Sequence, residues 1–128
     1  MTMIGLVLDC ADAEVLADFW AAALGYQRIG AAGQYVLLVP AGPGAPKLLL
    51  QRVPEAKVVK NRMHLDIETP DIEAEAARLE ALGARRLAVD VLAEHGTHWY
   101  VMADPEGNEF CVERSDAERS GGGWDPFL

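Results

Sequence analysis

Apolar and polar residues alternate strictly in two stretches of the chain, residues 63–68 (MHLDIE) and 109–113 (EFCVE). Successive side chains of a β-strand point to opposite faces, so the alternation predicts two strands, each with an apolar and a polar face. The polar faces carry His64, Asp66, Glu68, Glu109, Cys111 and Glu113. Each strand is therefore expected to cover a core with one face and to line a binding surface with the other.

The second stretch belongs to a predicted β-hairpin, residues 99–114. Its turn is the tetrapeptide DPEG, in which Pro105 presets the backbone angle of the second position and Gly107 can adopt the positive φ that closes the turn. Trp99 lies in the first strand of the hairpin, where it is either a packing residue or a stacking wall for a ligand. We expect the rest of the chain to be organised around this hairpin.

Apolar residues at helical spacing predict two helices. The first spans residues 13–24, after a cap at Asp12 or a neighbouring residue. The second follows Thr69 as the cap, with Pro70 as the first helical residue. Both helices end in the dipeptide Leu-Gly, where glycine is a common terminator.

Four further segments have the composition of strands, namely residues 4–10, 34–40, 47–53 and 85–91. Both halves of the chain then read as a strand, a helix ending in Leu-Gly and about three strands. Such an internal repeat predicts an α+β fold in which two similar modules share one core.

The repeat also sets the expected boundaries. The first module spans residues 1–53, a connector spans 54–61, the second module spans 62–115 and a tail spans 116–128, all within one domain. The tail contains three consecutive glycines and then apolar residues. Its Trp124 and Phe127 either fold back onto the domain or a partner, or belong to a disordered end.

The composition narrows the class of protein. With 128 residues and a hydrophobic fraction of 51%, the chain can bury a core, and no apolar run approaches the roughly 20 residues of a membrane span. The N-terminus lacks the basic start of a secretory signal, and Cys10 and Cys111 match neither a zinc spacing nor a disulfide framework. We expect a cytoplasmic protein with reduced cysteines.

The net charge of −9 argues against nucleic acid as a partner, because an acidic surface repels the phosphate backbone. Neither a nucleic acid nor a membrane is expected. A cationic small ligand is compatible with this charge, although an acidic surface also serves solubility alone.

Two sequence features together resemble the vicinal oxygen chelate superfamily, which includes glyoxalases, bleomycin-resistance proteins and extradiol dioxygenases. These are the helix end Phe19-Trp20 with Leu24-Gly25-Tyr26, and the hairpin ADPEGNEFCV. The segments KNRMHLDIE and DPEGNEFCV most resemble bacterial glyoxalase-like proteins of unassigned activity. The resemblance covers residues 3–114 and implies two βαβββ modules forming an eight-stranded cup, a small-molecule ligand or a metal in the cup, and a homodimer.

In metal-using members of this superfamily, the first and last strands of each module supply the metal ligands. The resemblance places these positions at Gly5, Gln51, His64 and Cys111. Glycine offers no side-chain ligand and glutamine is a weak one, whereas His64 and Cys111 suit a soft metal such as zinc. The cofactor is therefore expected to be either none or a single divalent metal held by His64, Gln51 and Cys111.

Several polar residues are candidates for chemistry, each with a plainer alternative. His64 is a general base or orients a ligand, with Asp66 or Glu113 setting its tautomer, or it is only hydrogen-bonded within the sheet face. Glu109 and Glu113 form an acid–base pair, or Glu109 is simply solvated at the mouth of the hairpin. Cys111 is a metal thiolate or an inert thiol, because Glu109 and Glu113 would raise its pKa and disfavour a nucleophile.

Two classes of function follow. The first is a binding protein for an amphipathic or cationic small molecule, lined by Val7, Leu49, Gln51, His64, Asp66, Trp99 and Cys111. The alternative is a glyoxalase-type lyase or isomerase in which His64 and a glutamate, Glu109 or Glu113, transfer protons, with or without a metal. A pure interaction module would leave the polar strand faces unexplained.

Overall fold

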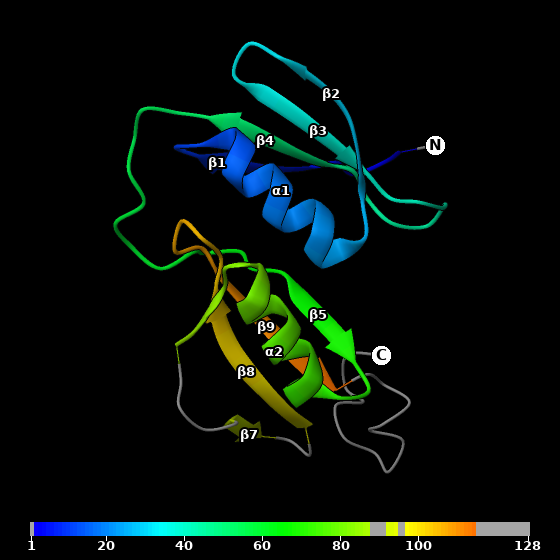
Figure 1. The fold of residues 1–128 in the computed structure, drawn as a ribbon, viewed down its shortest axis with the longest axis vertical. Coiled ribbons are helices and arrows are strands. Elements are labelled where there is room, and N and C mark those ends of the chain that lie inside the picture. Colours follow the sequence, from blue (N-terminus) through cyan, green and yellow to red (C-terminus); the bar gives the residue numbers. More distant parts are fainter. Residues whose placement is uncertain (1, 88–91, 95–96, 115–128) are drawn as a thin grey trace. The chain divides into compact units, whose positions relative to one another are not determined.

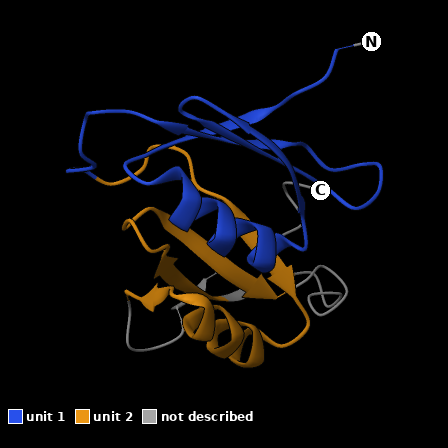
Figure 2. Ribbon diagram, turned by 45° about the horizontal axis from the view of Figure 1, so that its top comes forward, with its two compact units in different colours: residues 1–59 blue, residues 60–128 orange. Residues whose placement is uncertain are grey.

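A computed structural model describes residues 2–87, 92–94 and 97–114 of the chain. The predicted tail from residue 116 onward, including Trp124 and Phe127, lies outside the described residues. The chain divides into two compact units, unit 1 (Met1–Val59) and unit 2 (Lys60–Leu128) (Figure 2).

Unit 1 contains one helix and a four-stranded sheet (Figure 1). Its elements are β1 (Leu6–Cys10), α1 (Ala13–Leu24), β2 (Gln27–Ala32), β3 (Tyr35–Val39) and β4 (Leu48–Arg52). The strand order is β1-β4-β3-β2, with β1 parallel to β4 and the other pairs antiparallel.

Unit 2 repeats this connectivity. Its elements are β5 (Asp66–Thr69), α2 (Ile72–Leu82), β6 (Arg85–Arg86), β7 (Leu92–Glu94), β8 (Thr97–Ala103) and β9 (Glu109–Arg114). The strand order is β5-β9-β8-β6, again with the first strand parallel to the last, and β7 pairs with β8. The internal repeat and the α+β class are confirmed, and the short β7 is a ninth strand among the described residues where eight were expected.

Helix α1 has the predicted bounds because both of its ends are capped. The Asp12 carboxylate accepts hydrogen bonds from the backbone N–H groups of Glu14 and Val15, at 3.1 and 3.2 Å. Gly25 follows the helix with a φ of 69°, a left-handed conformation that glycine adopts without strain. The helix buries Leu16, Ala17, Phe19, Trp20 and Ala23.

Helix α2 begins later than predicted. Its cap is Asp71, whose carboxylate accepts a hydrogen bond from the Ala74 N–H at 3.0 Å. Thr69 is still the last residue of β5, and its hydroxyl accepts a hydrogen bond from the Asp71 N–H at 3.3 Å. The assignment of Thr69 as the cap and Pro70 as the first helical residue was therefore wrong, because an aspartate two residues on reaches the orphan amides of the first turn.

The strands differ from the prediction at three further places. Strand β6 is only Arg85–Arg86, where a strand over residues 85–91 was predicted, and residues 88–91 lie outside the described residues. Strand β2 was not predicted, since its sequence QRIGAA shows no alternation and all six of its residues are exposed at the edge of the sheet. Strand β5 begins at Asp66 rather than Met63, and Met63 is 78% exposed rather than on a core face.

The core of each unit lies on the inner face of its sheet. Fully buried strand residues are Leu38 and Leu50 in unit 1, and Met102, Phe110 and Val112 in unit 2. Among the described residues, no helix is long and apolar enough to cross a membrane.

Candidate functional site

The open face of the unit 2 sheet carries the polar residues that the alternation predicted. In β9, Phe110 and Val112 are buried, whereas Glu109, Cys111 and Glu113 are partly exposed on the opposite face. The register places Cys111 opposite Asp66 of β5, and Glu113 between Glu68 of β5 and Trp99 of β8. The predicted division of this strand into two faces is confirmed.

The tight turn before β9 fixes this arrangement. Asp104 is only 1% exposed, and its carboxylate accepts hydrogen bonds from the backbone N–H groups of Glu106 and Asn108, at 2.9 and 3.0 Å, and from the Asn108 side-chain amide. The Gly107 N–H closes the turn onto the Asp104 carbonyl at 2.8 Å, with φ of 88° at Gly107. The sequence analysis did not predict that the Asp104 carboxylate would accept the hydrogen bonds that hold the turn. An aspartate at the first turn position is the signal for such bonds.

Three potential ligand groups meet beside the start of the edge strand β5. The His64 Nδ1 lies 3.0 Å from Asp66 Oδ1, and one ligand atom each of His64, Asp66 and Cys111 lies within 4.8 Å of the others. The His64 and Asp66 side chains are 37% and 43% exposed, so a solute can reach them. We call these three residues the His64 cluster.

The Cys111 thiol is held in its protonated form. Burial is the largest cause, and it raises the pKa of the thiol. The charges of Asp66 and Glu113 and a hydrogen bond with Asp66 raise the pKa further, whereas the charge of Lys60 lowers it. The resulting pKa is about 11. The prediction that neighbouring carboxylates raise this pKa is confirmed for Glu113, but Asp66 takes the part that was expected of Glu109. Cys111 is therefore a poor nucleophile at neutral pH.

The donor set of the His64 cluster fits a divalent metal. One imidazole, one carboxylate and one thiol are the ligand types that zinc prefers, and three protein ligands leave a position open for a further ligand. Asp66 was predicted as a ligand-binding residue, not as a metal ligand. Gln51 lies on β4 of unit 1, and its assignment as a metal ligand stays a prediction.

Glu109 and Glu113 have different surroundings. The Glu109 carboxylate accepts a hydrogen bond from the backbone N–H of Asn61 at 2.9 Å, so Glu109 is engaged with the connector rather than solvated. Glu113 lies two residues beyond Cys111, on the same open face, and contributes to the raised pKa of the thiol.

The corresponding face of the unit 1 sheet is mostly apolar. Val7 of β1 is 57% exposed and lies opposite Leu49 of β4, which in turn lies opposite Leu37 of β3. Gln51 is partly buried between Asp9 and Tyr35 in the register. Gly5 precedes β1, and a Cβ there would lie 3.1 Å from Cε of Lys47.

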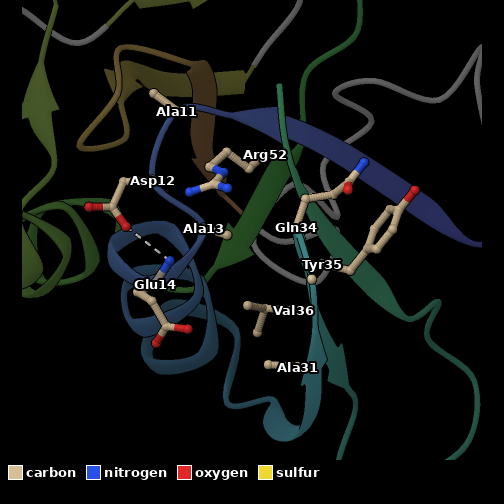
Figure 3. A pocket seen from close by; sticks show the side chains of 10 residues that line it. Ala11, Asp12, Ala13, Glu14, Ala31, Gln34, Tyr35, Val36 and Arg52 are labelled. Atoms are coloured by element: carbon tan, nitrogen blue, oxygen red, sulfur yellow. Dashed lines mark hydrogen bonds between the residues drawn. The ribbon is translucent and has the colours of Figure 1, made fainter. Parts of the chain in front are cut away.

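A separate hollow of about 410 Å³ lies in unit 1 beside the start of α1 (Figure 3). It is lined by Ala11, Asp12, Ala13, Glu14, Ala31, Gly33, Gln34, Tyr35, Val36 and Arg52. Arg52 extends its guanidinium toward the helix start, and the Gln34 and Tyr35 side chains point to the other side (Figure 3). Nearly all of these residues are exposed, so this is an open polar hollow, and none of the predicted site residues lines it.

Comparisons with known proteins agree with the fold. A sequence profile described as a glyoxalase-like domain matches residues 5–113. No curated protein matches the chain. Among solved structures, the fosfomycin resistance protein FosX from Listeria monocytogenes is 12% identical with a TM-score of 0.72, and the match covers 93% of this chain and 97% of that one.

Two other solved structures are similar. A glyoxalase/bleomycin resistance protein/dioxygenase family enzyme from Burkholderia phytofirmans is 15% identical with a TM-score of 0.70, covering 85% of this chain and 94% of its own. A member of the same superfamily from Sphaerobacter thermophilus is 18% identical with a TM-score of 0.65, covering 89% and 98%. At sequence identities this low, the similarity to these structures supports the fold alone. Because the profile spans nearly all of both modules, the chain belongs to the glyoxalase-like domain family.

Proposed function

We propose that this protein is a small-molecule-binding member of its family, and that it holds an amphipathic or cationic ligand against the open face of the unit 2 sheet. The observation that carries this proposal is the His64 cluster, in which an imidazole, a carboxylate and a thiol converge on one accessible point. No nucleic acid or membrane is expected as a partner. A homodimer and a cytoplasmic location stay predictions.

The charges around the cluster favour a cation. Asp66, Glu68 and Glu113 lie on the same face, next to one another in the strand register. The charge of Lys60 has the opposite effect to these carboxylates and lowers the pKa of Cys111. A positively charged group placed between the carboxylates gains Coulomb energy that is largest where the site is partly shielded from water. Trp99, opposite Glu113, offers an aromatic wall to the apolar part of such a ligand.

A second candidate function is a lyase or isomerase of the glyoxalase type. The contact that favours it is the 3.0 Å pair between His64 Nδ1 and Asp66, which orients the imidazole and leaves Nε2 as the nitrogen that can exchange a proton with a substrate. Glu113 is the glutamate whose charge acts on Cys111 of this cluster. A divalent metal held by His64, Asp66 and Cys111 would supply Lewis-acid polarisation of a substrate oxygen.

Calorimetric titration tests the proposal with two probes, Zn²⁺ and the organic cation benzyltrimethylammonium. We expect both to bind the wild type, and Asp66→Asn to weaken Zn²⁺ binding by about tenfold or more. His64→Ala should weaken Zn²⁺ binding strongly and leave the organic cation nearly unaffected, since only the metal needs the imidazole. Asp9→Asn, on the open face of unit 1, is the matched control and should change neither affinity.

The outcomes separate the candidates. If the organic cation binds and Zn²⁺ does not, the protein is a cation binder without a metal. If Zn²⁺ binds near stoichiometrically and the organic cation does not, the enzyme function is favoured. If neither probe binds the wild type, or both bind Asp66→Asn as tightly as the wild type, the proposal is wrong.

A further inference from the structure

The carboxylate of Glu109 is engaged with a distant part of the chain. It accepts a hydrogen bond from the Asn61 backbone N–H at 2.9 Å, in a partly buried position and across 48 residues of sequence. Asn61 belongs to the segment that leads from the connector into β5, and this segment carries His64. Glu109 was predicted to act as an acid or a base, which stays a prediction, and this contact indicates a structural role as well.

Strand β9 holds this segment at a second point. The Cys111 N–H donates a hydrogen bond to the Leu65 carbonyl at 2.9 Å. The two attachments, at Asn61 and Leu65, lie on either side of His64. Residues 61–65 have neither helical nor strand structure, so no regular ladder of hydrogen bonds holds them between these points.

Side-chain packing gives little further support to the segment. Met63 is 78% exposed and His64 itself is exposed, so neither is anchored in the core. The position of the His64 ring therefore depends on its bond to Asp66 and on where the backbone of residues 61–65 is held.

We infer that Glu109 is a positioning residue for His64: its carboxylate fixes the backbone at Asn61 and thereby sets the His64 imidazole against Asp66 and Cys111. The inference rests on the proposed function in one respect, that the position of His64 matters for binding. The hydrogen bond between Glu109 and Asn61 can be tested without any ligand. To position His64, Glu109 needs only a side-chain oxygen that can accept the hydrogen bond from Asn61. It does not need to gain or lose a proton.

Two substitutions separate these requirements. Glu109→Gln keeps the length of the side chain and an acceptor oxygen, so it should preserve the bond to Asn61. Glu109→Ala removes the acceptor. Glu68→Ala is the matched control, because it removes a carboxylate from the same open face at a residue for which no bond to the connector is found among the described residues.

Amide hydrogen exchange of Asn61 and the side-chain ¹⁵N signals of His64, both measured by NMR at one fixed pH, form the first test. A hydrogen bond to a charged acceptor is strong enough that Glu109→Ala should speed Asn61 exchange by about tenfold or more. The same variant should shift the His64 Nδ1 signal away from its Asp66-bonded value. Glu68→Ala should stay within about twofold of the wild-type exchange rate. Glu109→Gln should exchange at a rate between those of the wild type and Glu109→Ala, because its neutral acceptor forms a weaker bond, and both variants should keep the His64 signal.

The second test is the affinity for Co²⁺, followed by thiolate-to-cobalt charge-transfer absorption at Cys111. We expect Glu109→Ala to weaken binding about tenfold and Glu109→Gln to restore most of it, since residues that orient metal ligands have effects of this size. A loss in Glu109→Gln as large as that in Glu109→Ala would show a need for the charge and overturn the inference.

Unchanged Asn61 exchange and an unchanged His64 signal in Glu109→Ala would overturn the inference as well. A wild type that binds no Co²⁺ counts against a metal in the proposed function, and the NMR measurements still decide whether Glu109 positions His64.

Discussion

The two units have the same connectivity, but their helices are attached to their sheets in different ways. Helix α1 buries five residues, among them Phe19 and Trp20, whose rings meet edge to face at 5.0 Å. Helix α2 buries only Ala76 and Leu79. Burial of large apolar side chains is the main source of such attachment, so α2 needs another contribution.

That contribution is a polar cluster. Glu73 of α2 accepts hydrogen bonds from both terminal nitrogens of Arg86, at 2.9 and 3.1 Å, and from the Tyr100 hydroxyl. The Arg86 guanidinium lies 4.5 Å from the centre of the Tyr100 ring. Its buried Nε is 3.2 Å from Glu80 but outside hydrogen-bond geometry, so that contact is between charges only.

Unit 1 has the same ion pair without the cluster. Glu14, the second residue of α1, binds both terminal nitrogens of Arg28 at 2.7 Å. In each unit the glutamate is the second residue of the helix, and the arginine follows the glycine after the helix by three positions. The repeat therefore preserves the pair, and unit 2 adds Tyr100 and Glu80 to it where the apolar contact is small.

The largest expected effect tests the apolar attachment of α1. Trp20 is 2% exposed, and Trp20→Ala should lower the free energy of unfolding by about 3–5 kcal/mol, because it removes a large buried side chain and leaves a cavity. Leu79→Ala in α2 should cost less than this, about 2–3 kcal/mol. Urea unfolding followed by circular dichroism measures both.

Val15 supplies the control for that experiment. It lies on the same helix but is 46% exposed, so Val15→Ala should stay within about 0.5 kcal/mol of the wild type. A Leu79→Ala variant that is destabilised more than Trp20→Ala would contradict the distinction between the two helices.

The polar cluster of unit 2 is tested by removing one charge from each unit. Glu73→Gln should lower Tm by a few degrees, because three hydrogen bonds, two from Arg86 and one from Tyr100, lose a charged acceptor at once. Glu14→Gln, at the equivalent position, should lower Tm by about 1 °C, since an exposed ion pair contributes little. Equal changes in the two variants would argue that the cluster adds nothing to the pair.

The pH dependence of this difference has a definite sign. The Arg86 and Tyr100 hydrogen bonds lower the pKa of Glu73 in the folded state below the ordinary value of 4.5. As the pH falls below 4.5, Glu73 becomes protonated in the unfolded chain while it stays ionised in the folded protein. Protonation therefore favours the unfolded state, and the wild type loses stability. The difference in Tm between wild type and Glu73→Gln should therefore be largest near neutral pH and shrink as the pH falls through the folded pKa.

Local sequence patterns predicted the features that depend on neighbours in the chain. The bounds of α1 follow from Asp12 and Gly25, and the faces of β9 follow from its alternation. Strand β2 was missed because only its pairing with β3 makes it a strand. The pairs Glu14–Arg28 and Glu73–Arg86 occupy matching positions in the two halves of the sequence, but they were not predicted.

Most residues of the candidate site were named from the sequence, but the contacts that each side chain makes were not predicted. His64 and Cys111 were identified by resemblance, and the alternation placed Asp66 on the same face. The bond of Glu109 to Asn61 joins residues 48 apart, and no pattern within either segment signals it. Roles that depend on such distant partners require the folded structure.

The smallest effect concerns the open faces and compares one cysteine from each unit. Asp66 contributes both charge and a hydrogen bond to the raised pKa of Cys111, so Asp66→Asn should lower that pKa and increase the thiolate fraction at pH 8. Alkylation of Cys111 by iodoacetamide should become severalfold faster, up to about tenfold for each pKa unit. Burial remains as the largest cause of the shift, so the rate should stay below that of a free cysteine. Cys10 of unit 1, 3% exposed, should react slowly in both proteins, and Asp9→Asn should leave the rate at Cys111 unchanged. An unchanged rate at Cys111 in Asp66→Asn would mean that burial alone protects the thiol, and the acidic face of unit 2 would then lose its main electrostatic distinction from the apolar face of unit 1.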